Sequence, residues 1–288
     1  MFFRTDLAVE GEEASRTAPP EEERGGCRIT RMELRGEQAR RCRKPEGRYI
    51  TVELPPFSDH IDGDNQFLDV VAGELRALLP EEGLVLAAGL GNRAITPDAL
   101  GPKAMESVLA TRHIVGELSR ITGEGSLRAV AAVSPNVLGN TGMETLEILQ
   151  GLCGKLRPSA VVAVDALAAR SVRRLGRTVQ LSDAGIAPGA GIGNTRPQLS
   201  EKTLGIPVIG LGVPTVVDAS TLLFDLLEDT GASFAELREK IEPHGAQMVV
   251  TPREIDLLIG RAARLLGMSI NLALNPCFSV EEFTALVQ

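Results

Sequence analysis

Two aspartates are the first residues whose positions suggest chemistry, because each follows apolar residues typical of a buried strand. Asp98 lies in TPDAL, shortly after the run GLVLAAGLG, and Asp165 directly follows AVVAV. In open α/β sheets, ligands bind beyond the carboxyl ends of the strands. If these two strands lie close together, both carboxyl groups face one cleft, where they can share a proton. One aspartate would then activate a water molecule while its protonated partner polarises a carbonyl group, or the pair would hold a divalent cation.

Helix capping is the alternative explanation for each of these aspartates. An acidic residue in a first helical turn suits the helix dipole, and Asp98 follows Thr96 and Pro97 at the start of such a turn. For either aspartate considered alone, helix capping is a sufficient explanation. The occurrence of both aspartates on loops at the ends of strands in one sheet favours a functional site.

Two glycine-rich segments are expected at the same edge of the sheet. GLGN does not match the GxGxxG dinucleotide fingerprint, and APGAGIGNTR lacks the Lys-Ser/Thr pair of a phosphate loop. Glycine allows an extended peptide to approach the backbone closely, although these glycines could also simply turn the chain. The candidate substrate-groove residues are Gly89, Gly91, Asn92, Gly189, Gly191, Gly193 and Asn194.

Nucleophilic catalysis by serine or cysteine is not supported by the sequence. Ser171 and Ser182 have no histidine nearby, there is no GxSxG motif, and the four cysteines form no CxxC pair. His113 lies in a predicted helix and is expected to be a packed or surface residue rather than a third site group. The thiols are expected to be reduced, as in a cytosolic protein.

The composition is that of an ordinary globular protein, with 43% hydrophobic and 24% charged residues. The net charge of −8 argues against binding nucleic acid through its phosphates, which needs a basic surface. No uninterrupted apolar run approaches the roughly 18 residues of a membrane span, and no secretory signal is recognisable. We therefore expect a soluble, intracellular protein with no membrane partner.

The chain divides by composition into an N-terminal arm, residues 1–47, and an α/β domain, residues 48–288. GEEASRTAPPEEERGG is polar enough to stay loosely packed, and the residues after it alternate as one or two edge strands ending at 49–54. Beyond residue 65, apolar strands alternate with amphipathic helices, which predicts a three-layer α-β-α fold with a mostly parallel central sheet. The expected strands are 83–91, 128–133, 160–165 and 207–213, and the expected helices are 67–79, 102–118, 143–156, 216–227 and 251–267.

The last of these helices has the clearest start signal. Thr251 is the expected N-cap, Pro252 the first helical residue, and Glu254 the partner in a capping box.

Several sequence segments resemble those of the spore germination protease of endospore-forming bacteria. They are, in chain order, RTDLAVE, GLGNRAITPDALGPKA, TRH, VDALAARS, SDAGIAPGAGIGN and GIPVIGLGVPTVVDA. The resemblance extends from residue 4 to about 274. The chain is shorter than members of this family, mostly around residues 228–245.

The resemblance implies an endopeptidase, made as a zymogen, that degrades small acid-soluble spore proteins during germination. It implies a homotetramer in the cytoplasm of the spore (the spore core), a fold shared with hydrogenase-maturation proteases, and no cofactor. The family's catalytic candidates are two aspartates in the TPDALGP and DALAARS blocks, which correspond to Asp98 and Asp165 here.

The resemblance also gives a meaning to RTDLAVE near the start of the chain. The family cuts after an acidic residue and before a large apolar one, so this segment resembles a substrate carried by the protease itself. Cleavage between Asp6 and Leu7 would remove MFFRTD. The alternative is an N-terminal edge strand that is never cut.

The sequence is also compatible with two other functions. A metal-dependent maturation-type protease would use Asp98 and Asp165 as ligands, but this chain has no histidine in the matching late loop to complete the site. A non-catalytic protein could bind an anion in APGAGIGN, which would leave RTDLAVE unexplained.

Overall fold

The computed structural model describes residues 4–11, 19–57, 65–115, 127–193, 196–227 and 248–287. The groove candidate Asn194 and the shortened region 228–245 lie outside the described residues.

A single mixed sheet organises the described part of the chain, with strand order β1-β2-β3-β7-β8-β6-β4-β5 and β9 paired to β8. Its parallel part runs from β8 through β6 and β4 to β5. These strands are apolar on both faces, as expected for a sheet covered by helices on both sides. Their bounds are Val85–Gly89 for β4, Val130–Val133 for β5, Ala160–Ala169 for β6 and Val208–Asp218 for β8.

The other half of the sheet is antiparallel and comes largely from the N-terminal arm. A meander of β1, β2 and β3 pairs through β3 with β7, and β7 pairs with β8. The expected α/β class is therefore confirmed, and the sheet is more evenly mixed than the sequence suggested. The strands are Glu21–Arg24, Cys27–Leu34, Gly47–Glu53 and Thr178–Ser182, with Val249–Val250 as β9. The predicted boundary after residue 47 thus falls at the first residue of β3, within one continuous sheet.

Two central strands are longer than predicted. Strand β6 continues through DALAA to Ala169, and β8 continues through PTVVD to Asp218. Asp165 therefore lies inside β6 rather than at its tip, and helix α8, Ala219–Leu227, begins three residues later than expected. Mutual pairing of β6 and β8 over almost their whole length explains the extension, because each satisfies the backbone groups of the other.

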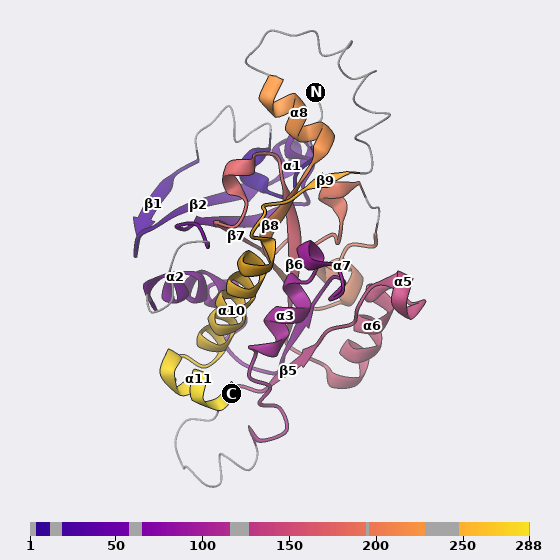
Figure 1. Cartoon of the computed structure of the whole chain (residues 1–288). Coiled ribbons are helices and arrows are strands. Elements are labelled where there is room, and N and C mark those ends of the chain that lie inside the picture. The colour runs from indigo at the N-terminus through magenta and orange to yellow at the C-terminus, as the bar shows by residue number, and fades with distance from the viewer. Residues whose placement is uncertain are drawn as a thin grey trace.

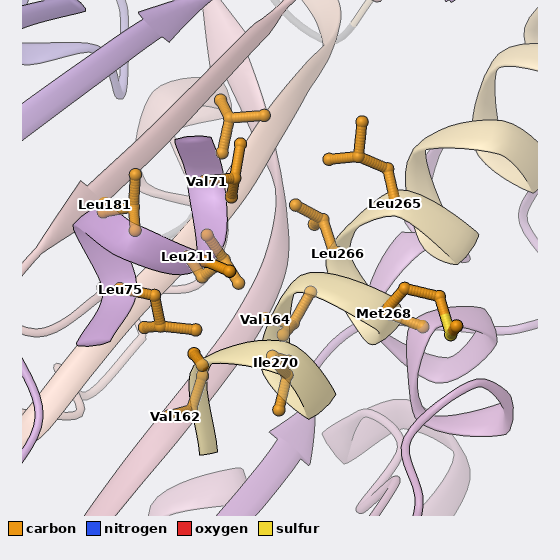
Figure 2. Packing of buried hydrophobic residues seen from close by; sticks show 14 of the residues in the cluster. Val71, Leu75, Val162, Val164, Leu181, Leu211, Leu265, Leu266, Met268 and Ile270 are labelled. Atoms are coloured by element: carbon orange, nitrogen blue, oxygen red, sulfur yellow. The ribbon is translucent and has the colours of Figure 1, made fainter. Parts of the chain in front are cut away.

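One face of the sheet carries helices α2 (Asn65–Arg76), α3 (Leu100–Glu106) and α10 (Ile255–Leu274). Helix α10 lies between α2 and α3 and packs against both (Figure 1). The core beneath them is aliphatic and includes Leu75 of α2 and Leu266 of α10 (Figure 2). Alternate strand residues such as Val164, Leu181 and Leu211 point into this core.

The opposite face is covered differently along its length, which completes the three layers. Helices α6 (Thr145–Leu156) and α7 (Glu201–Leu204) contribute to a second core with the remaining residues of β4, β6 and β8. Nearer the antiparallel half, the short helix α1, Gly36–Cys42, and the N-terminal residues close the face. The short helix α5, Leu138–Thr141, precedes α6, and α11, Val280–Val287, follows α10.

Helices α3 and α10 also differ from the prediction at their ends. Helix α3 ends at Glu106 instead of continuing toward residue 118. Helix α10 begins at Ile255 with Glu254 as N-cap and without a side-chain cap, because the Thr251 hydroxyl donates to the Thr215 carbonyl instead. Among the described residues, α10 is the one helix long and apolar enough to cross a membrane. Because 78% of that stretch is buried inside the protein, we interpret α10 as a core helix.

Candidate active site

The two predicted aspartates meet at the carboxyl end of the parallel strands. The last residue of β4, Gly89, pairs with Val164 of β6, so Asp165 lies one residue beyond the end of its neighbour. The chain leaving β4 forms a short loop and a 3₁₀ turn, Thr96–Asp98, which brings Asp98 back to the same edge. Asp165 thus lies within β6 instead of at its end, but it is still beside the loop that follows β4.

Asp98 holds the GLGN loop instead of capping a helix. Its Oδ2 atom accepts a hydrogen bond from the backbone N–H of Asn92 at 2.7 Å, while the following helix α3 has no side-chain cap. Gly91 has φ +105°, and a Cβ there would lie 2.1 Å from the Asp98 carbonyl oxygen. Burial raises the pKa of Asp98, and the Asn92 N–H partly opposes this shift.

Asp165 is almost fully buried, with 4% of its surface exposed. Its Oδ1 atom accepts a hydrogen bond from the N–H of Ala166 at 2.9 Å. Burial raises its pKa well above the usual value, and the negative charges of Asp98 and then Asp6 raise it further. The two predicted aspartates are therefore close enough to interact, and a third carboxyl group joins them.

A cavity of about 410 Å³ opens beside these groups. Asp98 and Asp6 both line it, together with Ala166, the residue that follows Asp165 in β6. The remaining walls are largely apolar, and Arg196 and Glu144 form an ion pair at 3.2 Å among them. A water molecule or a peptide group in this cavity would contact Asp98 directly, whereas Asp165 is not among the lining residues.

The N-terminal segment lies against the same site. Leu7 is extended, Asp6 lies in a bend and Ala8–Glu10 form a 3₁₀ turn, so the segment is only partly the strand that its sequence suggests. The Asp6 N–H donates to the Ala168 carbonyl at 2.7 Å, and the Ala168 N–H donates to Asp6 Oδ2 at 2.9 Å. Burial raises the pKa of Asp6, whereas Lys44 and the N–H groups of Ala168 and Gly191 oppose the shift.

The backbone on both sides of the Asp6–Leu7 bond is held by side chains from the sheet and the arm. Gln180 Nε2 donates to the Asp6 carbonyl oxygen at 3.0 Å, and Gln180 Oε1 accepts from the Ala8 N–H at 2.7 Å. Lys44 Nζ donates to the Thr5 carbonyl at 2.8 Å. This sequence of contacts resembles a peptide bound along a groove.

Individual side chains of the N-terminal segment also have their own binding contacts. Leu7 is fully buried in an apolar cluster with Leu167, Ala169 and Val217. The Glu10 carboxylate accepts from the N–H groups of Arg170 and Ser171 at 2.6 and 3.1 Å, and Arg174 Nε lies 3.4 Å away.

The groove candidates occupy three kinds of position. Gly89 is enclosed by α3, since a Cβ there would lie 2.2 Å from the Gly101 carbonyl oxygen. Asn92 and Gly189 line the cavity, and their place in a substrate groove stays a prediction. Gly191 and Gly193 lie against the N-terminal segment, and a Cβ on Gly191 would be 2.3 Å from Asp6 Oδ2.

Other candidate groups lie outside this constellation. His113 is exposed, and Ser171 caps a 3₁₀ turn by accepting from the Arg173 N–H. Cys27, Cys42 and Cys153 are buried thiols that form no disulfide. Within the described ranges no three His, Cys, Asp or Glu side chains form a group that could hold a metal ion.

Sequence reasoning missed Gln180, Lys44 and Arg174. The signal for Gln180 was present in TVQLS, where Thr178, Gln180 and Ser182 alternate with apolar residues and all three are buried. Polar side chains at every second position of a strand share one face of the sheet, and when they are buried that face must offer them hydrogen-bond partners. Nothing in the sequence marks Lys44 or Arg174 among so many arginines and lysines.

Comparison with solved structures gives a weak match to a [NiFe] hydrogenase maturation protease, HycI, from Thermococcus kodakarensis. The two are 15% identical with a TM-score of 0.35, and the match covers 68% of this chain and 98% of that one. At this TM-score the match carries no argument about the fold.

Comparison with protein families and curated proteins is much more specific. A family model described as Germination protease (peptidase family A25) matches residues 8–234. The germination protease of Clostridium perfringens strain 13 is 39% identical, covering 97% of each chain, and that of Caldanaerobacter subterraneus is 38% identical, covering 100% of this chain and 98% of the other. The germination protease of Priestia megaterium is 33% identical, covering 98% and 96%. The chain belongs to the germination protease family.

Proposed function

We propose that this protease is an aspartate-dependent endopeptidase that cuts after an acidic residue and before a large apolar one. The observation that carries the proposal is the electrostatic coupling of Asp98 and Asp165 beside a cavity that Asp6 also lines. Two coupled carboxyl groups share a proton most readily when one is buried and the other can reach water.

The burial of the two groups suggests how they divide the work. Asp165 is the more deeply buried and retains its proton, whereas Asp98 lines the cavity and accepts a proton from the attacking water. The pair titrates as a unit, so each apparent pKa belongs to both groups.

The N-terminal segment supports the proposed specificity and a zymogen that cleaves itself between Asp6 and Leu7. Asp6 is held by two backbone N–H groups, Leu7 fills an apolar pocket, and Glu10 is bound through its carboxylate. Substrates with the same pattern, including small acid-soluble spore proteins, would follow the same path once this segment is displaced. On this proposal the enzyme acts as a homotetramer in the spore core and needs no cofactor.

A peptide containing TDLAVE tests the proposal directly. The Asp98→Asn and Asp165→Asn proteins should lose cutting at the Asp–Leu bond while keeping their circular-dichroism spectra. Activity lost to a chelator and restored by a divalent ion would instead support a metal-dependent protease. Near-normal turnover by either variant would exclude the aspartate pair.

A further inference from the structure

We infer that Gln180 is a third catalytic residue, whose side-chain amide stabilises the oxyanion formed at the Asp6 carbonyl during cleavage of the Asp6–Leu7 bond. This inference rests on the proposed function, because it requires that bond to be the one cut.

The orientation of the Gln180 amide is fixed by its two partners. The Asp6 carbonyl oxygen can only accept a hydrogen bond and the Ala8 N–H can only donate one, so Nε2 must face the first and Oε1 the second. The side chain is 8% exposed, so water competes little for either contact.

The donor distance suits a group that stabilises developing charge. Gln180 Nε2 lies 3.0 Å from the Asp6 carbonyl oxygen, the atom on which negative charge develops when water adds to the carbonyl carbon. Side-chain amides of Asn and Gln serve as oxyanion donors in acyl transfer generally.

Gln180 also occupies the correct row of the sheet. Gln180 pairs with Gly212 of β8, and Gly212 pairs with Asp165 of β6, so one glycine separates the amide from the buried carboxyl group. The residues next to them in each strand, including Leu181 and Val164, point into the α10 core (Figure 2). Gln180 and Asp165 therefore project from the opposite face, on which Leu7 packs.

Space for water lies beside the Gln180 amide. A cavity of about 110 Å³ touches Asp6, Gln180 and Gly212, which is room for about three water molecules.

The step balances as follows. The oxygen of water forms a bond to the Asp6 carbonyl carbon and gives a proton to the carboxylate of the pair, while the carbonyl π electrons move onto the oxygen that faces Gln180 Nε2. When the carbonyl re-forms, the carbon–nitrogen bond breaks and the Leu7 nitrogen takes a proton from the pair. Gln180 neither gains nor loses a proton.

Two substitutions separate the donor from the acceptor of this side chain. Gln180→Glu keeps the acceptor for the Ala8 N–H and loses the donor when ionised, so kcat on the TDLAVE peptide should fall about 100- to 1000-fold with a smaller change in KM. Gln180→Met loses both contacts without adding charge, so kcat should fall similarly and KM should rise. Acidification should partly restore the Gln180→Glu enzyme, because a protonated carboxyl group can donate again.

The matched control is Gln150→Glu. Gln150 also donates to a backbone carbonyl, that of Thr203, but lies on the exposed side of α6. This variant should keep the wild-type kcat.

The outcomes distinguish the inference from the proposed function. If the wild-type enzyme cuts the peptide and folded Gln180→Met retains kcat within fivefold, Gln180 is not catalytic and the aspartate mechanism stands. If the wild-type enzyme does not cut, both fall. N-terminal sequencing of aged Gln180→Met protein gives a second readout, since loss of the donor should leave the Asp6–Leu7 bond intact.

Discussion

Gln180 and Asp165 lie in one lateral row of the sheet, on either side of Gly212. With strands about 4.8 Å apart, their Cα atoms are separated by about 10 Å. The side chains of both project from the face on which the N-terminal segment is docked, and Gln180 contacts the Asp6 carbonyl. The row therefore connects the buried carboxyl group to the bond that resembles a cleavage site.

The buried carboxyl group of Asp165 should reduce the stability of the fold as pH rises. Its folded-state pKa lies well above its unfolded value, so the folded state binds more protons, and stability falls from about pH 3.9 until the raised pKa is passed. Asp165→Asn keeps an acceptor for the Ala166 N–H and cannot ionise. Its melting temperature should exceed that of the wild type by several degrees at pH 8 and by less at pH 5. A variant that is equally destabilised at both pH values would contradict this.

The Glu10 position should determine preference for an acid four residues after the cut. The carboxylate of Glu10 is nearly enclosed by the N–H groups of Arg170 and Ser171 and by Arg174. Hydrogen bonds to a charged group contribute about 1.5–3 kcal/mol, so a TDLAVQ peptide should be cut at least about tenfold more slowly than TDLAVE in kcat/KM.

Arg174→Gln should reduce this discrimination, measured as a double-mutant cycle between enzyme and peptide. Arg174 also pairs with Glu53 at 2.5 Å, so the thermal stability of the variant must be measured in parallel. Arg173→Gln is the control, because its side chain is exposed next to Arg174. If the Arg174 and Arg173 variants discriminate equally between the TDLAVE and TDLAVQ peptides, the Arg174 guanidinium does not recognise Glu10.

Gly191 should be required for docking of the acidic residue before the cut. A Cβ at this position would lie 2.3 Å from Asp6 Oδ2 and 2.6 Å from Ala168 Cβ, so Gly191→Ala must displace Asp6. Self-cleavage and cutting of the peptide should both fall at least tenfold, with little change in melting temperature. Gly154→Ala on α6, where a Cβ would meet nothing within 4 Å, is the control and should keep full activity.

The site was predictable from the sequence where it depends on strand ends. Asp98 and Asp165 follow apolar runs, and the rule that ligands bind at strand ends placed them together without knowledge of any contact. The extension of β6 past Asp165 was not predictable, since DALAA has no β-branched residue and begins with an aspartate, which is more typical of a turn than of a strand. Strand β7 could have been predicted, because TVQLS alternates polar and apolar residues with the period of a strand.

The role of Gln180 could not be read from the sequence because its partners are distant. It contacts residues more than 170 positions away, and only pairing of β7 between β3 and β8 brings them together. The same holds for Leu7, whose burial depends on β6 and β8.

The pH profile of cleavage should be bell-shaped, and its two limbs follow from the carboxyl pair. Burial raises the pKa of Asp98, and activity needs this group ionised, so kcat/KM should rise with pH at values above the usual aspartate range of about 3.9. Activity also needs one proton on the pair, and burial with the charge of Asp98 raises the pKa of Asp165 well above the usual value, so kcat/KM should fall again at higher pH.

Adding a positive charge nearby should move both limbs to lower pH, and Asn92→Lys supplies one beside Asp98, although this change also alters the cavity wall. The measurement is kcat/KM for the TDLAVE peptide from pH 4 to 9. A profile that rises through the pH of histidine titration and then stays level would instead indicate a different general base, because a single ionisation cannot produce the falling limb.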